Sequence, residues 1–573
     1  MKDSSSSGDD SDQEGRQQLL QRQAAALERL AVVSDPEYKP RKKAIRNMLG
    51  LAFAGCGLMV GSYEFGLFVW DSYQRRCLKE NLVEVAREMY EVEGSSAEAA
   101  DLLKQAGQLG EQDVAVITLS AYIDGMGTVE RLINLDRPMN SEDVDAYGHA
   151  MGQAVMLERV NPSSPEWAIL RGQLALSANE PERAQRFLEQ ALQMDPDSAF
   201  ATLRLGLVYE RLSASASESV VKEEQFAVAQ RLIDRSIKLD PRFKWGHLWK
   251  GVLAMEHNRD VKGALESFQT SVTLDPRFAV AWVNIGRAYE LAEEWPEAER
   301  AYLRALELRP DLHLAMVGLA YVYGAQDRYE IGLRFARRAT GTNKGSLKAW
   351  TMHGLLAREM AVKVEARDPT AAKEFRAEAI GAYSQALDLE PRDTGAYIER
   401  AKLSLLEGQL EQAGEDARIA TVFSPEDPYA WNALGCFQAQ SGFTDRAVTT
   451  FEKVIAIDPT FDAAYLDLAR ALIKLGQLDR ALEQLARGLE RSTDEFRDDI
   501  LLERGKLQEQ LGKQAEALED FMAARKASVE SFDAWLCEAR VLRSLGRVEE
   551  SVAAAQEALQ LRPGDEAAIK YAR

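Results

Sequence analysis

The sequence predicts an all-α solenoid of about eleven stacked helical hairpins, preceded by one transmembrane helix. Three observations support this fold class. Prolines recur every 34 or 35 residues, pairs of small residues recur with them on helical stretches, and a run of 23 mostly apolar residues lies near the start. The 573 residues are 46% hydrophobic and 28% charged, which is a globular composition.

The charge, cysteine and histidine content of the chain exclude several classes of function. The chain carries 70 Lys and Arg against 91 Asp and Glu, a formal charge of −21, which argues against nonspecific nucleic-acid binding. Its four cysteines, Cys56, Cys77, Cys436 and Cys537, are far apart and form neither a dense disulfide framework nor a CxxC pair. With only five histidines and no His/Cys/Asp cluster, neither a metal site nor a cofactor is expected.

Residues 1–47 form a predicted cytoplasmic tail. The segment SSSSGDDSD is polar, and residues 14–33 show helical periodicity, with Leu20, Ala24, Leu27 and Ala31 on one face. Two interpretations stay open, a short docking helix and a solvated helix that leads into the membrane.

Residues 48–70 are the predicted transmembrane helix. They contain one charge, Glu64, and at about 1.5 Å per residue they would span roughly 34 Å. A buried core helix is the alternative, because five glycines and Glu64 make the run less apolar than most spans. Gly57 and Gly61 form a G-x-x-x-G pair, a pattern that lets two membrane helices approach, and they are candidates for homodimer contact.

The charges on either side of this run predict its orientation. Five basic residues lie just before it and three just after it, which places the N-terminus in the cytoplasm and the rest of the chain outside it. The 47 polar residues ahead of the run distinguish it from a cleaved signal peptide. The predicted location is therefore the inner membrane, single-pass, with the following region on the periplasmic side.

Residues 71–164 look helical but fit no repeat, and we expect them to cap the solenoid. The repeat follows. Its prolines, Pro241, Pro276 and Pro310, and then Pro391, Pro425 and Pro459, mark regular helix ends. One unit contains Trp282, Ile285, Gly286 and Tyr289 on one helical face and Ala298, Tyr302 and Ala305 on a second. This pattern predicts a hairpin of two amphipathic helices that buries its apolar faces by stacking on the next hairpin.

These residues resemble the tetratricopeptide repeat (TPR), a 34-residue pattern of Trp, Leu-Gly, Tyr, Ala, Phe, Ala and Pro, over about residues 165–565. The first small position of the eleven units is filled by Gly172, Gly206, Gly251, Gly286, Ala320, Gly354, Ala401, Gly435, Ala469, Gly505 and Ala539. The second is filled by Ala184, Ala229, Ala264, Ala298, Gly332, Ala379, Ala413, Ala447, Ala481, Ala517 and Ser551. The resemblance implies a right-handed superhelical stack.

Two units depart from the pattern. Insertions at 213–226 and 360–375 lengthen their hairpins, and we expect them to lie between the two helices of a hairpin. The unit at 313–346 has Lys344 in place of its terminal proline, so we expect a junction near residue 340 that separates a first group of units, 165–346, from a second, 347–565. Residues 566–573 form a C-terminal helical end.

The resemblance also implies a ligand-binding groove lined by the first helix of each pair. An apolar part is predicted at Phe200, Leu203, Trp245, Leu248, Val280, Val283, Val317 and Tyr321. A basic part is predicted at Lys348, Arg358, Lys402, Arg470, Lys506 and Arg540. An extended partner with an apolar and an acidic portion would fit such a groove. The alternative is that the apolar residues pack against neighbouring hairpins and that the basic residues pair with nearby acids.

No catalytic motif is found. The P-loop, G-x-S-x-G and HExxH patterns are absent from the sequence, and no catalytic residue is predicted. The family's clamp for a C-terminal carboxylate needs Lys and Asn at groove positions where this chain has Val283, Arg287, Asn432 and Cys436, so we do not expect that clamp.

The sequence thus favours a non-enzymatic, membrane-anchored TPR scaffold. It would bind a protein partner in its groove and help to assemble or maintain a membrane or envelope complex. The alternative is a cytosol-facing membrane receptor or co-chaperone for targeting sequences or client proteins. Neither interpretation identifies the client.

Overall fold

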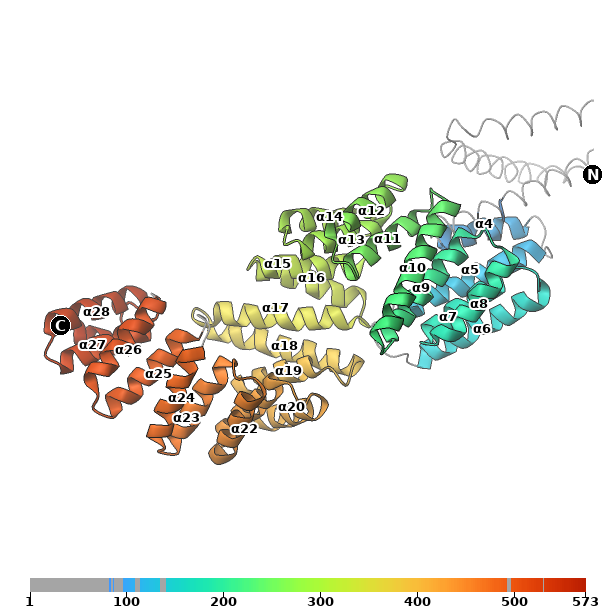
Figure 1. Cartoon of the computed structure of the whole chain (residues 1–573). Coiled ribbons are helices and arrows are strands. Elements are labelled where there is room, and N and C mark those ends of the chain that lie inside the picture. Colours follow the sequence, from blue (N-terminus) through green and yellow to red (C-terminus); the bar gives the residue numbers. More distant parts are fainter. Residues whose placement is uncertain are drawn as a thin grey trace, which may run out of the picture. The chain divides into compact units, whose positions relative to one another are not determined.

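The computed structural model describes residues 82–83, 86, 96–108, 114–133, 141–491, 496–528 and 530–573. Those residues form 26 helices, α4 to α29, and no strand (Figure 1). The chain divides into two units, and the larger, Val85–Leu103 with Gln112–Arg573, contains every hairpin considered below.

Eleven consecutive helix pairs follow one another from α7 to α28, as the sequence predicts. The first helices are α7 (Glu166–Ser177), α9 (Ala199–Ser215), α11 (Lys244–Glu256), α13 (Ala279–Leu291), α15 (His313–Ala325), α17 (Leu347–Glu365), α19 (Thr394–Leu406), α21 (Pro428–Gln440), α23 (Asp462–Lys474), α25 (Arg497–Gln510) and α27 (Phe532–Ser544). The second helices are α8 (Pro181–Met194), α10 (Ser219–Leu239), α12 (Val261–Leu274), α14 (Trp295–Leu308), α16 (Tyr329–Thr342), α18 (Pro369–Leu389), α20 (Leu410–Phe423), α22 (Thr444–Ile457), α24 (Leu478–Arg491), α26 (Gln514–Ala527) and α28 (Val548–Leu561). Every predicted small residue lies on the expected helix and is buried.

The small residues are buried because large side chains of the second helices pack against them. A Cβ atom added to Gly286 would lie 2.7–2.8 Å from ring atoms of Tyr302, and one added to Gly318 would also meet that ring. Tyr302 on α14 is therefore held between α13 and α15. Its hydroxyl donates to Glu290 at 2.7 Å, and burial together with Glu290 raises the pKa of Tyr302, which keeps this donor protonated.

Tight turns join the two helices of most hairpins. In nine of the eleven, one residue of the turn has a positive φ, which ends the first helix in the left-handed conformation. From α19 onward this residue is glycine, whereas the earlier hairpins place Asn179, Arg259, Glu293 and Asp327 there. Side chains other than glycine tolerate this backbone poorly, so Arg259 and Glu293 store strain.

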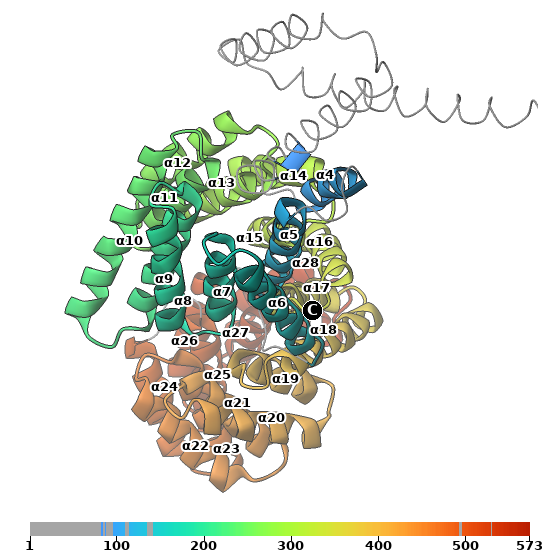
Figure 2. The same ribbon diagram turned by 90° about the vertical axis from the view of Figure 1, so that its right-hand side faces the viewer.

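Most first helices of successive hairpins contact one another, whereas second helices make no comparably extensive contact among themselves. The two helices of a hairpin lie side by side, as α9 and α10 do in both views (Figures 1 and 2). We call the side formed by the first helices the first-helix face. Neighbouring first helices lie closer together than neighbouring second helices, which is the arrangement expected of a stack that curves toward this face.

The two inserted segments lengthen two hairpins at equivalent places. α9 and α10 contain 17 and 21 residues, and α17 and α18 contain 19 and 21, against 12 to 14 for the other helices of the eleven pairs. Extensive contact between successive first helices is interrupted after each, between α9 and α11 and between α17 and α19. The insertions are thus helical extensions of the two arms of a hairpin.

Equivalent side-chain contacts tie each long hairpin to the hairpins on either side. Towards the following hairpin, Phe226 stacks on His257 with ring centroids 3.9 Å apart, and Arg376 pairs with Glu407. Both partners directly follow a first helix. Towards the preceding hairpin, the side chain of Arg211 reaches the turn residue Asn179, and Lys363 donates to the backbone oxygen of Asp327 in the corresponding turn.

Three helices are described ahead of the eleven hairpins. They are α4 (Ser96–Gln108), α5 (Val114–Ile133) and α6 (Ser141–Val160), and α5 and α6 form a further pair whose second member packs on α7. A short helix, α29 (Glu566–Ala572), packs on α28 and α27 at the other end. The predicted domain boundaries, including the junction near residue 340, remain predictions, and α15 and α17 contact each other across it.

The predicted tail at 1–47, the predicted transmembrane helix at 48–70 and its Gly57 and Gly61 lie outside the described residues. In the part of the chain that the structure describes, no helix combines the length and the apolar composition needed to cross a membrane.

Candidate functional site: the first-helix face

The predicted apolar residues divide into two groups by burial. Phe200, Leu203, Leu248 and Val283 are buried at 2–7% exposure, so they pack within the stack. Trp245, Val280 and Val317 are partly buried, and Tyr321 is 41% exposed. Only the second group can present apolar surface on the first-helix face, and two of its members come from α15.

α15 is apolar on every side, although one side of it is exposed. Met316, Leu319 and Ala320 are fully buried in the stack. Leu314 and Tyr321, which lie two helical turns apart, are 45% and 41% exposed, with the partly buried Val317 between them. A helix that is hydrophobic all round is normally covered on all sides. We call Leu314, Val317 and Tyr321 the α15 strip.

The turn region beside the α15 strip adds more apolar surface. Leu291, the last residue of α13, is 61% exposed. The ring of Trp295 at the start of α14 lies 6.3 Å from the ring of Tyr321. An aromatic side chain of α14 is thus brought next to Tyr321, and Leu291 adds an exposed apolar side chain at the end of α13.

Five of the six predicted basic residues are paired with carboxylates. Arg358 on α17 pairs with Glu399 on α19, and Lys402 pairs with the same Glu399 at 3.0 Å. The remaining pairs repeat this pattern further along the face: Arg470 with Glu503 at 3.8 Å, Lys506 with Glu503 at 3.1 Å, and Arg540 with Glu509 at 2.7 Å. We call this series, from α17 to α27, the charge ladder.

The charge ladder changes the electrostatic character expected for this half of the face. Burial opposes ionisation of Glu399, but Lys402 and Arg358 outweigh it and lower the pKa of Glu399. Glu399 therefore stays charged and offsets the charge of the two bases beside it. Lys348 is the exception, since it is exposed and makes no ion pair with any residue that the structure describes.

A buried polar cluster interrupts the charge ladder between α21 and α23. The Cys436 thiol lies 3.5 Å from Asp467 Oδ2, and Asn432 is placed beside both. Burial raises the pKa of Asp467, and burial together with Asp467 raises the pKa of Cys436. The thiol therefore stays protonated and donates to the carboxylate, which is the opposite of the environment that activates a cysteine. The sequence analysis placed Asn432 and Cys436 at groove positions but did not select Asp467 as their partner.

A second polar cluster joins α16, α17 and α18 away from the predicted groove. Arg337 makes two hydrogen bonds of 2.6 Å to Glu378, and the Nε2 atom of His353 lies 2.7 Å from the same carboxylate. Burial opposes ionisation of Glu378, but these two partners outweigh it and lower its pKa to about 2. Arg337 and His353 both bind the carboxylate of Glu378, so this cluster has a structural role.

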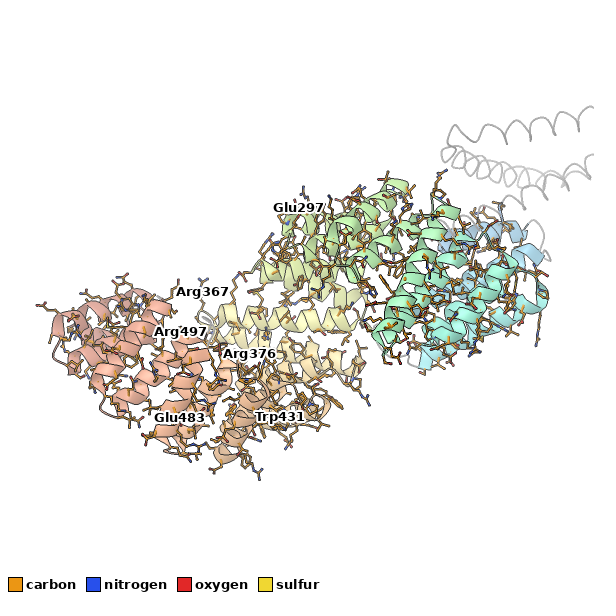
Figure 3. The ribbon with its side chains drawn as sticks, in the orientation of Figure 1. Glu297, Arg367, Arg376, Trp431, Glu483 and Arg497 are labelled. Carbon is orange, nitrogen blue, oxygen red and sulfur yellow. The ribbon has the colours of Figure 1, made fainter. Side chains whose placement is uncertain are left out.

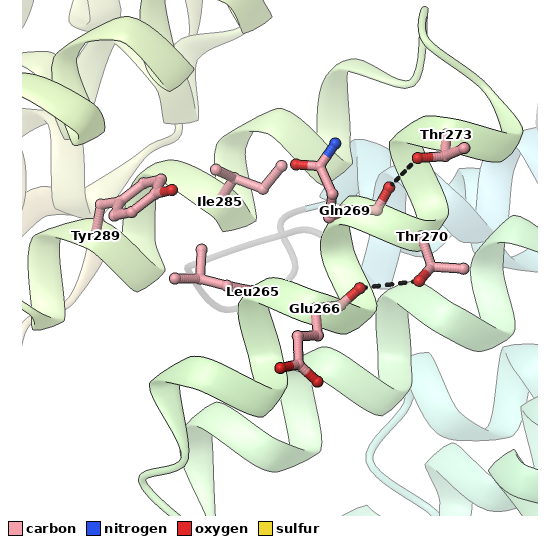
Figure 4. A pocket seen from close by; sticks show the side chains of 7 residues that line it. All are labelled: Leu265, Glu266, Gln269, Thr270, Thr273, Ile285 and Tyr289. Atoms are coloured by element: carbon pink, nitrogen blue, oxygen red, sulfur yellow. Dashed lines mark hydrogen bonds between the residues drawn. The ribbon is translucent and has the colours of Figure 1, made fainter.

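No arrangement suited to catalysis emerges from the described residues. They contain no group of three or more His, Cys, Asp and Glu side chains that could hold a metal ion. A shallow pocket between α12 and α13 is lined by Leu265, Glu266, Gln269, Thr270, Thr273, Ile285 and Tyr289 (Figure 4). Its threonine hydroxyls donate to backbone oxygens of their own helix, at 2.9 and 2.7 Å, so no set of free polar groups converges there.

Comparisons with known proteins agree with this architecture. Models described as tetratricopeptide repeat match residues 169–218, 279–312, 439–498 and 502–566. The chain therefore contains tetratricopeptide repeats, and its all-α stack has the architecture of such repeats.

Two curated relatives and one solved structure illustrate the similarity. The chain is 22% identical to superkiller protein 3 of Schizosaccharomyces pombe over 44% of its own length and 18% of that protein. It is 24% identical to the peroxisomal targeting signal receptor of Candida albicans over 42% of its length and 40% of the receptor. The chain thus spans less than half the length of these relatives. The crystal structure of yeast Tom70 is similar over 78% of this chain and 94% of that one, with 14% identity and a TM-score of 0.40.

Proposed function

We propose that this chain is a non-enzymatic, membrane-anchored scaffold that holds a protein client on its first-helix face, with the α15 strip as the apolar contact. The observation that carries the proposal is the exposed side of α15, where Leu314 and Tyr321 remain accessible on a helix that is otherwise covered. Burying a fully exposed side chain of this size contributes about 1.5–3 kcal/mol, and since Leu314 and Tyr321 are 45% and 41% exposed, covering each contributes about 0.6–1.4 kcal/mol.

Quantitative affinity purification tests the proposed contact. The double variant Leu314→Asp/Tyr321→Asp places two charges on the α15 strip. Leu303→Asp is the control, because Leu303 is an exposed apolar residue, 37% accessible, on the second helix α14. Proteins recovered with the wild-type chain and with the Leu303 variant, but depleted with the double variant, support the proposal. Equal recovery with all three chains contradicts it.

The anchor is the second part of the proposal. The run at 48–70 contains one charge in 23 residues, and its preceding flank is the more basic. We place the N-terminus in the cytoplasm and the repeats outside it, where the scaffold would help to assemble or maintain an envelope complex. Gly57 and Gly61 would allow two such helices to pair.

Reporter fusions test the anchor and its orientation. A reporter that is active only outside the cytoplasm is fused after Lys79 and, separately, after Pro563. Activity at both positions, in a protein that stays in the membrane after carbonate extraction, supports the orientation. Silence at both positions reverses it.

A cytosol-facing receptor for targeting sequences or client proteins is the second candidate. Similarity to a protein named as a peroxisomal targeting signal receptor, over 42% of this chain, favours it. Both candidates use the first-helix face, and they differ in the compartment that the reporter fusions identify.

A further inference from the structure

A basic residue without an ion pair on the first-helix face indicates which chemical group the client presents there. Of the six basic residues predicted for the groove, five have a carboxylate partner within the charge ladder, and Lys348 has no ion pair with a described residue. A client carboxylate that approached Arg540, for example, would compete with the two-point contact from Glu509 at 2.7 and 2.9 Å. At Lys348 no resident carboxylate has to be displaced.

Lys348 lies beside the α15 strip. It is the second residue of α17, and Leu314 is the second residue of α15. α15 and α17 are successive first helices in contact, so equivalent positions on the two helices lie at the same end of the first-helix face. The unpaired cation therefore borders the Leu314 end of the strip, whereas Tyr321 lies about two turns further along α15.

We propose that the client segment bound at this place combines apolar side chains, which cover the α15 strip, with one acidic side chain next to them that pairs with Lys348. This inference rests on the proposed function and adds the chemistry of the ligand to it. The acidic group is local, since each base further along the charge ladder already has a carboxylate partner. The occupant is thus an acidic-apolar peptide segment of a protein, in an extended or helical form.

The three side chains act on different properties of the client. Leu314 and Tyr321 supply contact area that any large apolar residue can use. They therefore contribute to affinity but discriminate little between apolar client side chains. Lys348 distinguishes an acidic from a basic neighbour, because a like charge at this point is repelled. An exposed ion pair of this kind changes affinity by only about two- to fivefold, so the assay has to report preference rather than bare binding.

A displayed peptide library reports this preference directly. Twelve-residue random peptides are selected on the immobilised full-length chain in detergent, and the recovered sequences are counted. Four chains are compared: wild type, Lys348→Glu, Lys344→Glu and Leu314→Asp/Tyr321→Asp. Lys344 is the matched control, because it is an exposed lysine four residues earlier, outside the helix, and its substitution changes the net charge equally.

The expected result is that the charge preferred next to the apolar residues of the selected peptides reverses when Lys348 is replaced by glutamate. On the wild type and on the Lys344 control, peptides enriched in Leu, Ile or Phe carry Asp or Glu next to these residues, about two- to fivefold above the starting library. On Lys348→Glu the same apolar residues are retained, and Lys or Arg replaces the acid. An acidic preference that persists on Lys348→Glu overturns the inference while leaving the proposed function intact.

The double variant separates the two claims. Loss of apolar enrichment on Leu314→Asp/Tyr321→Asp shows that the selected peptides use the α15 strip. Apolar enrichment that survives in this variant, or that never appears on the wild type, overturns both the proposed function and the inference. Far-ultraviolet circular dichroism of each variant, matched to the wild type, ensures that selection reports on a folded chain.

Discussion

Replacing Gly318 by alanine should destabilise the stack, although alanine is the better helix former. Gly318 lies on α15, and an added Cβ atom would come within 2.7 Å of three ring atoms of Tyr302. The ring has little freedom to retreat, because it is 1% exposed, its hydroxyl is bonded to Glu290 at 2.7 Å, and Gly286 contacts it from the other side. The substitution therefore forces α15 away from α14.

The magnitude follows from two opposing effects. Overpacking of a close-packed core costs about 1–3 kcal/mol, and replacing a helical glycine by alanine returns about 0.5–1 kcal/mol. We expect Gly318→Ala to lower the free energy of unfolding by up to about 2.5 kcal/mol. Gly381→Ala on α18 is the matched control, because no atom lies within 4 Å of its added Cβ, and it should raise the free energy by about 0.5–1 kcal/mol.

Urea denaturation followed by circular dichroism measures both variants against the wild type. The expected midpoints lie below that of the wild type for Gly318→Ala and above it for Gly381→Ala. Because α15 carries the exposed strip, Gly318→Ala should also weaken client recovery. A Gly318→Ala chain as stable as the Gly381→Ala chain would refute the view that a ring pressed between two glycines sets the spacing of α13 and α15.

Three further predictions concern the turns, pH and the long hairpins. Glu293→Gly should raise the thermal midpoint, with a gain of about 1 kcal/mol, because it relieves a left-handed backbone at φ 56°; an unchanged midpoint would argue against strain. The pKa of Glu378 is lowered to about 2, so its stabilising contribution is complete above its ordinary pKa near 4.5 and is lost as pH falls from there towards 2. In Glu378→Gln the urea midpoint should therefore fall less steeply with pH over that range than in the wild type. Parallel plots of midpoint against pH for the two chains would contradict this role of Glu378. Arg376, labelled in Figure 3, pairs with the nearly buried Glu407, and Arg376→Ala leaves Glu407 without this partner. Amide hydrogen exchange in α19 should therefore accelerate, by the equivalent of about 2–3 kcal/mol in the free energy of local opening, with exchange in α7 as the internal reference. Exchange in α19 that matched the wild type would contradict a tethering role for Arg376.

The repeat could be predicted because its signal is local. A pair such as Gly286 and Ala298 must be small wherever two helix backbones approach, so it repeats in every unit and survives the loss of other consensus residues. All eleven pairs lie on the predicted helices. The two insertions were also predictable in position, since they fall between the small residues of one hairpin.

The surface of the first-helix face was harder to predict, because it depends on contacts between units. Phe200, Leu203, Leu248 and Val283 occupy the same kind of helical position as Tyr321, yet they are buried. Whether a neighbouring hairpin covers such a residue depends on the spacing of the stack, which no single unit encodes. Leu314 is exposed because, at the spacing of this part of the stack, no neighbouring hairpin in the described part of the chain covers it.

The pairing of charges shows the same dependence on spacing. Arg540 and Glu509 are 31 residues apart, and Arg358 and Glu399 are 41 apart because the long hairpin intervenes. Each pair forms only when successive first helices bring equivalent faces together. Sequence reasoning identified the bases and considered neutralisation as an alternative, but it could not identify the carboxylates that pair with them.

Site-specific photocrosslinking in intact cells tests the central claim most directly. A photoreactive amino acid replaces Tyr321 on the α15 strip in one chain and Leu303 on the second helix α14 in another, and crosslinked products are separated and identified by mass spectrometry. A client on the first-helix face predicts one or a few defined protein adducts from position 321 that are absent from position 303. The same adducts from both positions, or adducts from position 303 alone, would contradict a client held on the α15 strip.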